Sequence, residues 1–291
     1  MRGWFGARAA TFLAIVCGCG ALAPQTAAVN ITIDYSFDTN NFFSSQVRRD
    51  ALQAAADFYS DILEDTLVGG TIPSRVTSTV DDGYWEWQLR FTNPSTGAAE
   101  IVTSATLAQD EYLIYAGGRP LGGNTLGQGG PGGFAFGRFN NQGEFDDTIQ
   151  FASNQFPTIN QGNSDFQAGF VDRGETDGFV RWGGALTFDS DGSTNWHFGI
   201  ESGPTSSGQS DFLSVALHEL GHTLGLGASS EWTSLVNSGR FQGPAAIAAN
   251  GGIAPPADFG HWQEGTQSTI YGTFTRQEAA LDPIITSGTR K

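Results

Sequence analysis

The sequence contains few of the residue types that most often define a function. Its two cysteines, Cys17 and Cys19, lie close to the N-terminus in a segment that is expected to be removed after export. The remaining chain would therefore form no disulfide and offer no thiolate for catalysis or metal binding. Met1 is the one methionine and Lys291 the one lysine. A bound metal would have to use histidine and carboxylate ligands.

Positive charge is scarce, because 14 lysines and arginines stand against 30 acidic residues, which gives a formal net charge of −16. Such a field repels nucleic acid and anionic lipid headgroups, so we expect no nucleic-acid partner. No segment beyond the N-terminal leader approaches about 18 consecutive apolar residues, so we expect no membrane span. The acidity is consistent with solubility outside the cell or with calcium binding.

The first 28 residues are typical of a signal peptide. Arg2 and Arg8 precede an apolar run over 9–23, and two alanines follow at 27–28. We therefore expect export of a mature chain that begins directly after this segment. The alternative is a lipoprotein acylated at Cys19, although the residues before it match the usual lipobox poorly.

Residues 29–291 are expected to form a single domain, because no internal repeat or linker composition divides them. Alternating apolar residues predict strands at 31–37, 84–92, 111–115 and 178–188. A helix capped by Ser44 or Ser45 is expected to bury one face, made of Val47, Ala51, Ala54, Phe58 and Ile62. This order predicts an α+β fold with a sheet backed by a helix. The glycine-rich stretch 117–133 lacks the pattern of a phosphate-binding loop and is expected to be a surface loop.

Residues 210–225 carry the most informative pattern. They predict a helix that is capped by Ser210 and ends at Gly225. Spacings of three and four predict a buried stripe of Leu213, Ala216, Leu217, Leu220 and Leu224. His218 and His222 lie one turn apart on an adjacent face, so their imidazoles can bind one ion.

This arrangement predicts a catalytic zinc site. Zinc suits imidazole ligands, and a catalytic site uses three protein ligands together with a water whose pKa the metal lowers. Glu219 directly follows His218 and can accept the proton of that water as a general base. The hypothesis is therefore zinc-dependent hydrolysis of peptide bonds, with His218 and His222 as two of the ligands.

The run His218-Glu219-Leu220-Gly221-His222-Thr223-Leu224-Gly225 resembles the active-site helix of the metzincin metallopeptidases, and 183–191 resembles the matrixin segment that precedes it. The resemblance covers roughly 183–283. It implies a zincin-like catalytic domain with a twisted, mostly parallel sheet, a backing helix and a cleft along an edge strand. An N-terminal lobe of about 29–225 would then be followed by a small irregular lobe of about 226–291. The implied activity is that of an endopeptidase acting on proteins or peptides.

The third metal ligand departs from the matrixin pattern. Three residues after Gly225 the sequence has Ala228, which cannot bind a metal. The resemblance favours His261, because leishmanolysin-like metzincins also insert a long segment before their third histidine. Glu231 is the carboxylate alternative, and His197 matches no zinc position of the family.

Two further features follow from the resemblance. Residues 279–283 are similar to the matrixin turn beneath the metal, with Leu281 where methionine is expected. Leucine has a similar volume, so a modest packing effect is expected. Asp189 and Asp191 resemble part of a calcium-binding loop, although the full calcium-loop pattern is incomplete.

Two other classes of function remain open at this stage. A catalytically inactive, zincin-like binding or surface protein would keep the helix without turnover, but the intact Glu219 argues against it. A glycan-binding or glycan-cleaving protein would use the seven tryptophans and acidic pairs, which have no catalytic context. The leading hypothesis is a secreted zinc endopeptidase.

Overall fold

The computed structural model describes residues 29–174, 181–201, 206–269 and 276–291. The predicted signal peptide therefore lies outside the described residues, as does the beginning of the strand predicted at 178–188. Among the described helices, none is long and apolar enough to cross a membrane. The elements form a mixed α and β structure, as the sequence predicts.

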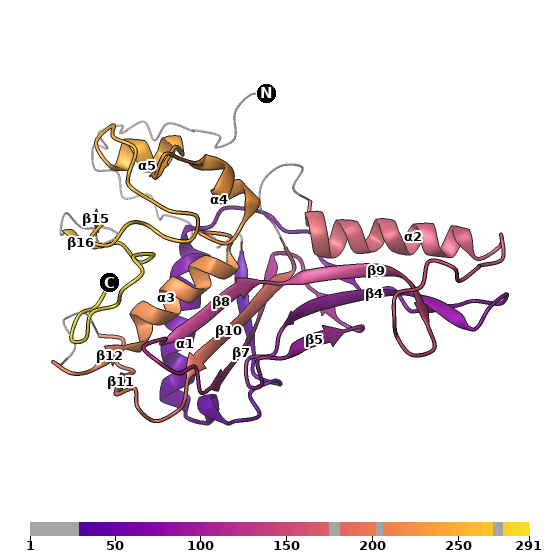
Figure 1. Cartoon of the computed structure of the whole chain (residues 1–291), viewed down its shortest axis with the longest axis horizontal. Helices are drawn as coiled ribbons and strands as arrows, with labels where there is room; N and C mark the ends of the chain where they lie inside the picture. Colours follow the sequence, from indigo (N-terminus) through magenta and orange to yellow (C-terminus); the bar gives the residue numbers. More distant parts are fainter. Residues whose placement is uncertain (1–28, 175–180, 202–205, 270–275) are drawn as a thin grey trace, which may run out of the picture.

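A four-stranded sheet lies at the centre of the molecule (Figure 1). It contains β1 (Asn30–Asp34), β7 (Glu111–Arg119), β10 (Gly183–Asp189) and β8 (Gly127–Pro131), in that spatial order. The pairings of β1 with β7 and of β7 with β10 are parallel, whereas β8 runs antiparallel to β10 at the edge. The prediction of a surface loop over 117–133 is therefore wrong for β8 and for the end of β7. Alternating glycines allow this edge to lie directly against a helix, as described below.

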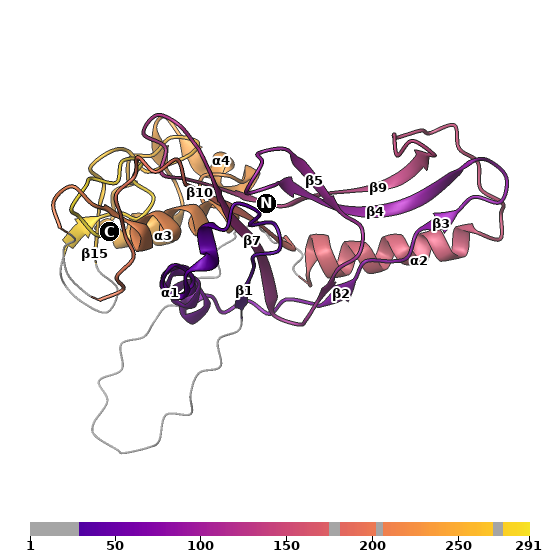
Figure 2. The same cartoon turned by 90° about the horizontal axis from the view of Figure 1, so that it is seen from below.

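Two helices cover one face of this sheet (Figure 2). They are α1 (Gln46–Ile62) and α3 (Phe212–Thr223), which pack against each other and against the sheet. The predicted face of α1 is right at Ala51 and otherwise wrong. Its buried residues are Ala51, Leu52, Ala55, Ala56 and Tyr59, whereas Val47, Phe58 and Ile62 are exposed. The stripe of small alanines allows α1 to approach α3 closely.

A second, antiparallel sheet packs on the opposite face and extends away from α3 (Figures 1 and 2). Its long strands are β4 (Gly83–Thr92) and β9 (Gly133–Asn140), and β4 also pairs with β5 (Ala99–Val102) and β3 (Val76–Thr77). The helix α2 (Phe156–Phe166) lies along β4. There, the side-chain oxygen of Asn163 accepts hydrogen bonds from the indole N–H groups of Trp85 and Trp87. The sequence predicted β4 but not this extension.

The chain after α3 has little regular secondary structure. It contains α4 (Ser230–Leu235), α5 (Pro244–Ala249) and two antiparallel strand pairs, β13 with β14 (Val236–Asn237, Arg240–Phe241) and β15 with β16 (Gln267–Thr269, Arg276–Glu278). Trp232, Phe241 and Ala257 form a separate small core with Trp262 packed against it. Short elements complete the described chain: η1 (Phe42–Ser44), β2 (Gly70–Thr71), β6 (Thr106–Leu107), η2 (Gln167–Asp172), β11 (Trp196–His197) and β12 (Ser210–Asp211).

Candidate metal centre

The helix α3 begins one residue later than predicted. Its N-cap is Asp211, whose carboxylate accepts hydrogen bonds from the backbone N–H of Ser214 at 3.0 Å and from the Ser214 hydroxyl at 2.6 Å. Ser210 instead lies in the two-residue strand β12. Asp211 is fully buried and also accepts two hydrogen bonds from the guanidinium of Arg290. A carboxylate serves both partners, which a serine hydroxyl could not do.

Two tyrosines anchor the C-terminal half of α3. The hydroxyl of Tyr59, from α1, donates to the backbone oxygen of Leu217 at 2.9 Å, and the hydroxyl of Tyr112, from β7, donates to that of Thr223. Burial raises the pKa of both phenols, so both remain proton donors. The predicted stripe is partly right: Ala216 and Leu220 are buried, whereas Leu213, Leu217 and Leu224 are only partly buried.

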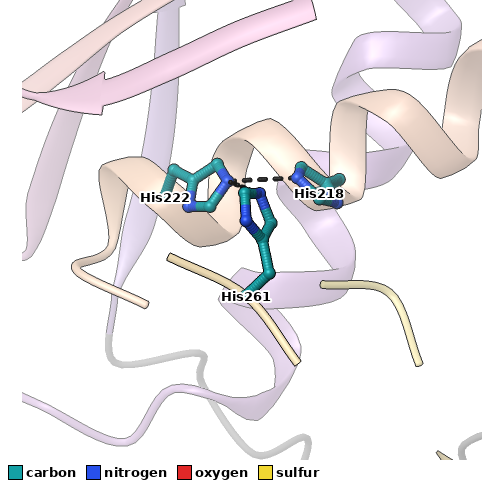
Figure 3. Close-up of side chains that lie close together, drawn as sticks. All are labelled: His218, His222 and His261. Atoms are coloured by element: carbon teal, nitrogen blue, oxygen red, sulfur yellow. Dashed lines mark hydrogen bonds between the residues drawn. The ribbon is translucent and has the colours of Figure 1, made fainter. Parts of the chain in front are cut away.

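The three histidines predicted as metal ligands converge on one point (Figure 3). His218 and His222 extend from the same side of α3, and His261 approaches from the later part of the chain. The Nε2 atom of His222 lies 3.0 Å from Nε2 of His218 and 3.3 Å from Nε2 of His261. The Nδ1 atoms of His218 and His222 contact the backbone oxygens of Ala280 at 2.9 Å and Leu226 at 2.8 Å. These carbonyls place a proton on Nδ1 and leave a lone pair on each Nε2.

This geometry fits a zinc ion. Four nitrogen or oxygen ligands at 2.0–2.1 Å in a tetrahedron lie about 3.3 Å apart, close to the separations between the imidazole nitrogens. Burial, together with the neighbouring charge of His222, lowers the pKa of His218 to about 4, and burial likewise lowers the pKa of His222. Neutral imidazoles whose lone pairs face one another repel unless a cation lies between them. The donor set is therefore that of a divalent metal site.

Glu219 lies beside this cluster, against the edge strand β8. Its side chain is buried, which raises its pKa to about 7, although a hydrogen bond from the backbone N–H of Gly129 opposes the shift. A side chain at Gly127 would lie 2.9 Å from Oε1 of Glu219, and one at Gly129 would lie 2.2 Å from its backbone oxygen. The backbone contact makes glycine necessary at Gly129, whereas a side chain at Gly127 would require the side chains of Glu219 and Val215 to shift. Sequence reasoning missed this role, although the two-residue spacing of Gly127 and Gly129 was a visible signal.

A cavity of about 1110 Å³ opens beside the histidines and Glu219. The edge strand β8, residues 193–195 and residues 283–287 form its other walls. β8 is at the edge of the central sheet, so its outward backbone groups have no strand partner among the described elements. The cavity is thus bordered by a free strand edge and by the candidate metal ligands.

The alternative third ligands lie elsewhere. His197 is in β11, and its Nε2 atom is 3.8 Å from a carboxylate oxygen of Glu201. Glu231 is in the first turn of α4, where its carboxylate accepts a hydrogen bond from the hydroxyl of Ser230. Neither belongs to the group of three histidines.

The turn at 279–283 lies beneath the histidines, as its resemblance implied. Ala280 supplies the carbonyl that contacts His218, and the buried Leu281 packs against Gly221 of α3. The backbone N–H of Trp262 donates to the Leu281 oxygen at 3.1 Å. Leu281 thus forms an apolar support under the helix.

The structure gives no support to calcium at Asp189 and Asp191. One carboxylate oxygen of Asp189 accepts from the backbone N–H of Leu121, and the other accepts from the hydroxyl of Thr194. A different acidic group, Glu264, Glu278 and Asp282, is close enough to hold an ion. There, however, the buried ammonium of Lys291 already lies 3.0 Å from Glu278 and 3.2 Å from Asp282.

The matrixin family model matches residues 133–240, which is less than half of the chain. The match extends further toward the N-terminus than the resemblance in the sequence, and it contains His218, Glu219 and His222 but not His261. It supports a matrixin-like family of the metzincin type and points to a metallopeptidase, a hydrolase that acts on proteins and normally binds zinc. No curated protein and no solved structure gives a significant match.

Proposed function

We propose that this chain is a secreted zinc-dependent endopeptidase, with His218, His222 and His261 as metal ligands and Glu219 as general base. The observation that carries the proposal is the convergence of the three Nε2 atoms beside a buried carboxylate. The family match supports the same chemistry. The signal-peptide pattern of the first 28 residues supports export.

Zinc, when bound, would supply a Lewis acid and lower the pKa of water to about 7. Glu219 accepts a proton from the attacking water on its carboxylate and later donates it to the leaving amine of the peptide. Its raised pKa, about 7, suits both transfers because the group can exist in either protonation state near neutral pH. The N–H of Gly129 holds the carboxylate in one orientation.

The free edge of β8 supplies a place for the substrate. An extended peptide can pair with an exposed strand edge through backbone hydrogen bonds, which bind many sequences because they involve no side chain. Gly127, Gln128 and Gly129 of β8 line the cavity, and of their backbone groups the N–H of Gly129 is already donated to Glu219. The scissile bond of a peptide bound there would lie next to Glu219. The substrate class is therefore unfolded or loop segments of proteins.

The test is to measure zinc content and casein cleavage for the purified protein and for single variants. The parent is expected to bind about one zinc and to cleave, Glu219→Ala to keep zinc but lose cleavage, and His261→Ala to lose both. His197→Ala and Glu231→Ala are controls that should keep both. A parent that binds zinc but never cleaves would favour the zincin-like binding protein. Normal activity of His261→Ala would disprove the ligand assignment.

A further inference from the structure

His261 is the last residue of a tight turn in the chain that follows α3. The backbone N–H of Asp258 donates to the oxygen of His261 at 2.9 Å, and Ala257 pairs with Trp262 in an antiparallel bridge. The turn consists of Asp258, Phe259, Gly260 and His261, in which Phe259 is exposed. The position of the His261 imidazole therefore depends on what holds this turn.

Asp258 holds the turn with its side chain. One oxygen, Oδ1, accepts hydrogen bonds from the backbone N–H of Gly260 at 2.7 Å and from that of His261 at 2.7 Å. The carbonyl of Asp258 also accepts from the indole N–H of Trp232 at 3.1 Å, which ties the turn to the small core after α3. A single oxygen shared by two successive amides fixes the backbone of the residue that carries the imidazole.

The other side of the turn rests against the end of α3. Gly227 has a φ of 69°, and a side chain there would lie 1.7 Å from the backbone oxygen of Gly260. Gly227 follows Leu226, whose oxygen contacts Nδ1 of His222. The backbone that contacts His222 and the backbone that carries His261 are therefore in van der Waals contact with each other.

The geometry points to Asp258 as the positioning residue for the third metal ligand. Its carboxylate accepts hydrogen bonds from the backbone amides of Gly260 and His261 and so sets the direction of the His261 side chain. In this direction, Nε2 of His261 lies 3.3 Å from Nε2 of His222. This inference rests on the proposed metal site. Asp258 does not contact the metal position itself, and the feature that matters is the location of Oδ1 rather than its charge.

The test measures zinc affinity by chelator competition, together with the visible absorption of the cobalt-substituted protein, which reports tetrahedral coordination. Asp258→Ala is expected to weaken zinc binding by about 10- to 100-fold, as is usual when the support of a ligand is removed. Asp258→Asn keeps an oxygen at the same place and is expected to bind within about threefold of the parent. Asp258→Glu keeps the charge but moves the oxygen, so we expect weak binding. Asp146→Ala is the control. The carboxylate of Asp146 accepts hydrogen bonds from Thr148 in a comparable turn that is far from the three histidines. This variant should bind zinc as the parent does.

His261→Ala is expected to lose zinc on purification but to retain weak binding through His218 and His222 that chelator competition can measure, and this background separates positioning from general destabilisation. If Asp258 acts through His261, adding Asp258→Ala to that variant should weaken zinc binding no further, because the ligand that it positions is already gone. Parental affinity in Asp258→Ala, or equal weakening in Asp258→Asn and Asp258→Ala, would overturn the inference. A parent that binds no zinc would instead overturn the proposed function, together with this inference.

Discussion

The backbone of Gly129 lies directly against the backbone of Glu219, so that no side chain fits between the edge strand β8 and the helix α3. A Cβ atom at Gly129 would be 2.2 Å from the Glu219 oxygen, and the N–H of the same glycine donates to the Glu219 carboxylate. Strand and helix are therefore in contact at the residue proposed to move the proton. A change at this strand position should affect stability and catalysis together.

Gly129→Ala is expected to force the strand away from the helix, lowering stability by about 1–3 kcal/mol as other overpacked substitutions do. The rate of casein cleavage should fall at least tenfold, because the carboxylate loses its orientation. Gly130→Ala is the matched control, since a side chain at that glycine meets nothing within 4 Å. Urea unfolding and initial rates measure both effects, and equal behaviour of the two variants would contradict the contact.

The metal-free Glu219→Gln variant is expected to become more stable than the parent as the pH rises. Burial raises the folded pKa of Glu219 from 4.5 to about 7, so the ionised form is disfavoured in the folded state. The parent should therefore hold its full stability below about pH 4.5 and lose up to about 3 kcal/mol as pH rises through 7. The variant has no carboxyl group at this position, so its stability should not fall in this way. Urea unfolding of both chelated proteins at pH 5 and pH 8 tests the sign, and a difference independent of pH would refute it.

Leu281 should tolerate methionine but not alanine. Leu281→Met keeps the apolar volume under Gly221 and should cost less than about 1.5 kcal/mol, with cleavage retained. Leu281→Ala leaves a cavity under α3 and should cost about 2–5 kcal/mol. Thermal unfolding of the three proteins gives the comparison. If both substitutions cost the same, Leu281 does not support the helix by its volume.

Arg290→Ala is expected to destabilise the start of α3. The guanidinium lies 2.6 Å from Asp211, which is fully buried, so removing the cation leaves an uncompensated charge and should cost about 3 kcal/mol. The double variant Asp211→Asn, Arg290→Ala removes that charge while keeping the capping oxygen. In urea unfolding, the double variant should be more stable than Arg290→Ala alone. A less stable double variant would show that the unpaired carboxylate of Asp211 is not the cause of the destabilisation.

The sequence predicted the parts of the site that depend on local spacing. His218 and His222 are one helical turn apart, so their shared direction follows from the period of the helix alone. His261 was reached because few histidines were available and because a resemblance indicated a delayed ligand. The structure brings its Nε2 atom to the other two.

Contacts between distant segments could not be read in this way. The glycines of β8 were predicted to form a surface loop because the partner that requires glycine at Gly129, the backbone of Glu219, is about 90 residues away. The cap of α3 was placed at Ser210 because the partner that selects Asp211 is Arg290, which is 79 residues later. In both cases the residue type is set by a neighbour in space that no local pattern contains.

The contact between Gly227 and Gly260 closes the intervening chain into a loop whose two ends meet beside the three histidines. His261 follows His222 by 39 positions in the sequence, yet their Nε2 atoms are only 3.3 Å apart. The entropy of closing such a loop grows only with the logarithm of its length. Related chains can therefore lengthen or shorten this segment, and acquire new surfaces on it, without altering the geometry in which the histidines meet.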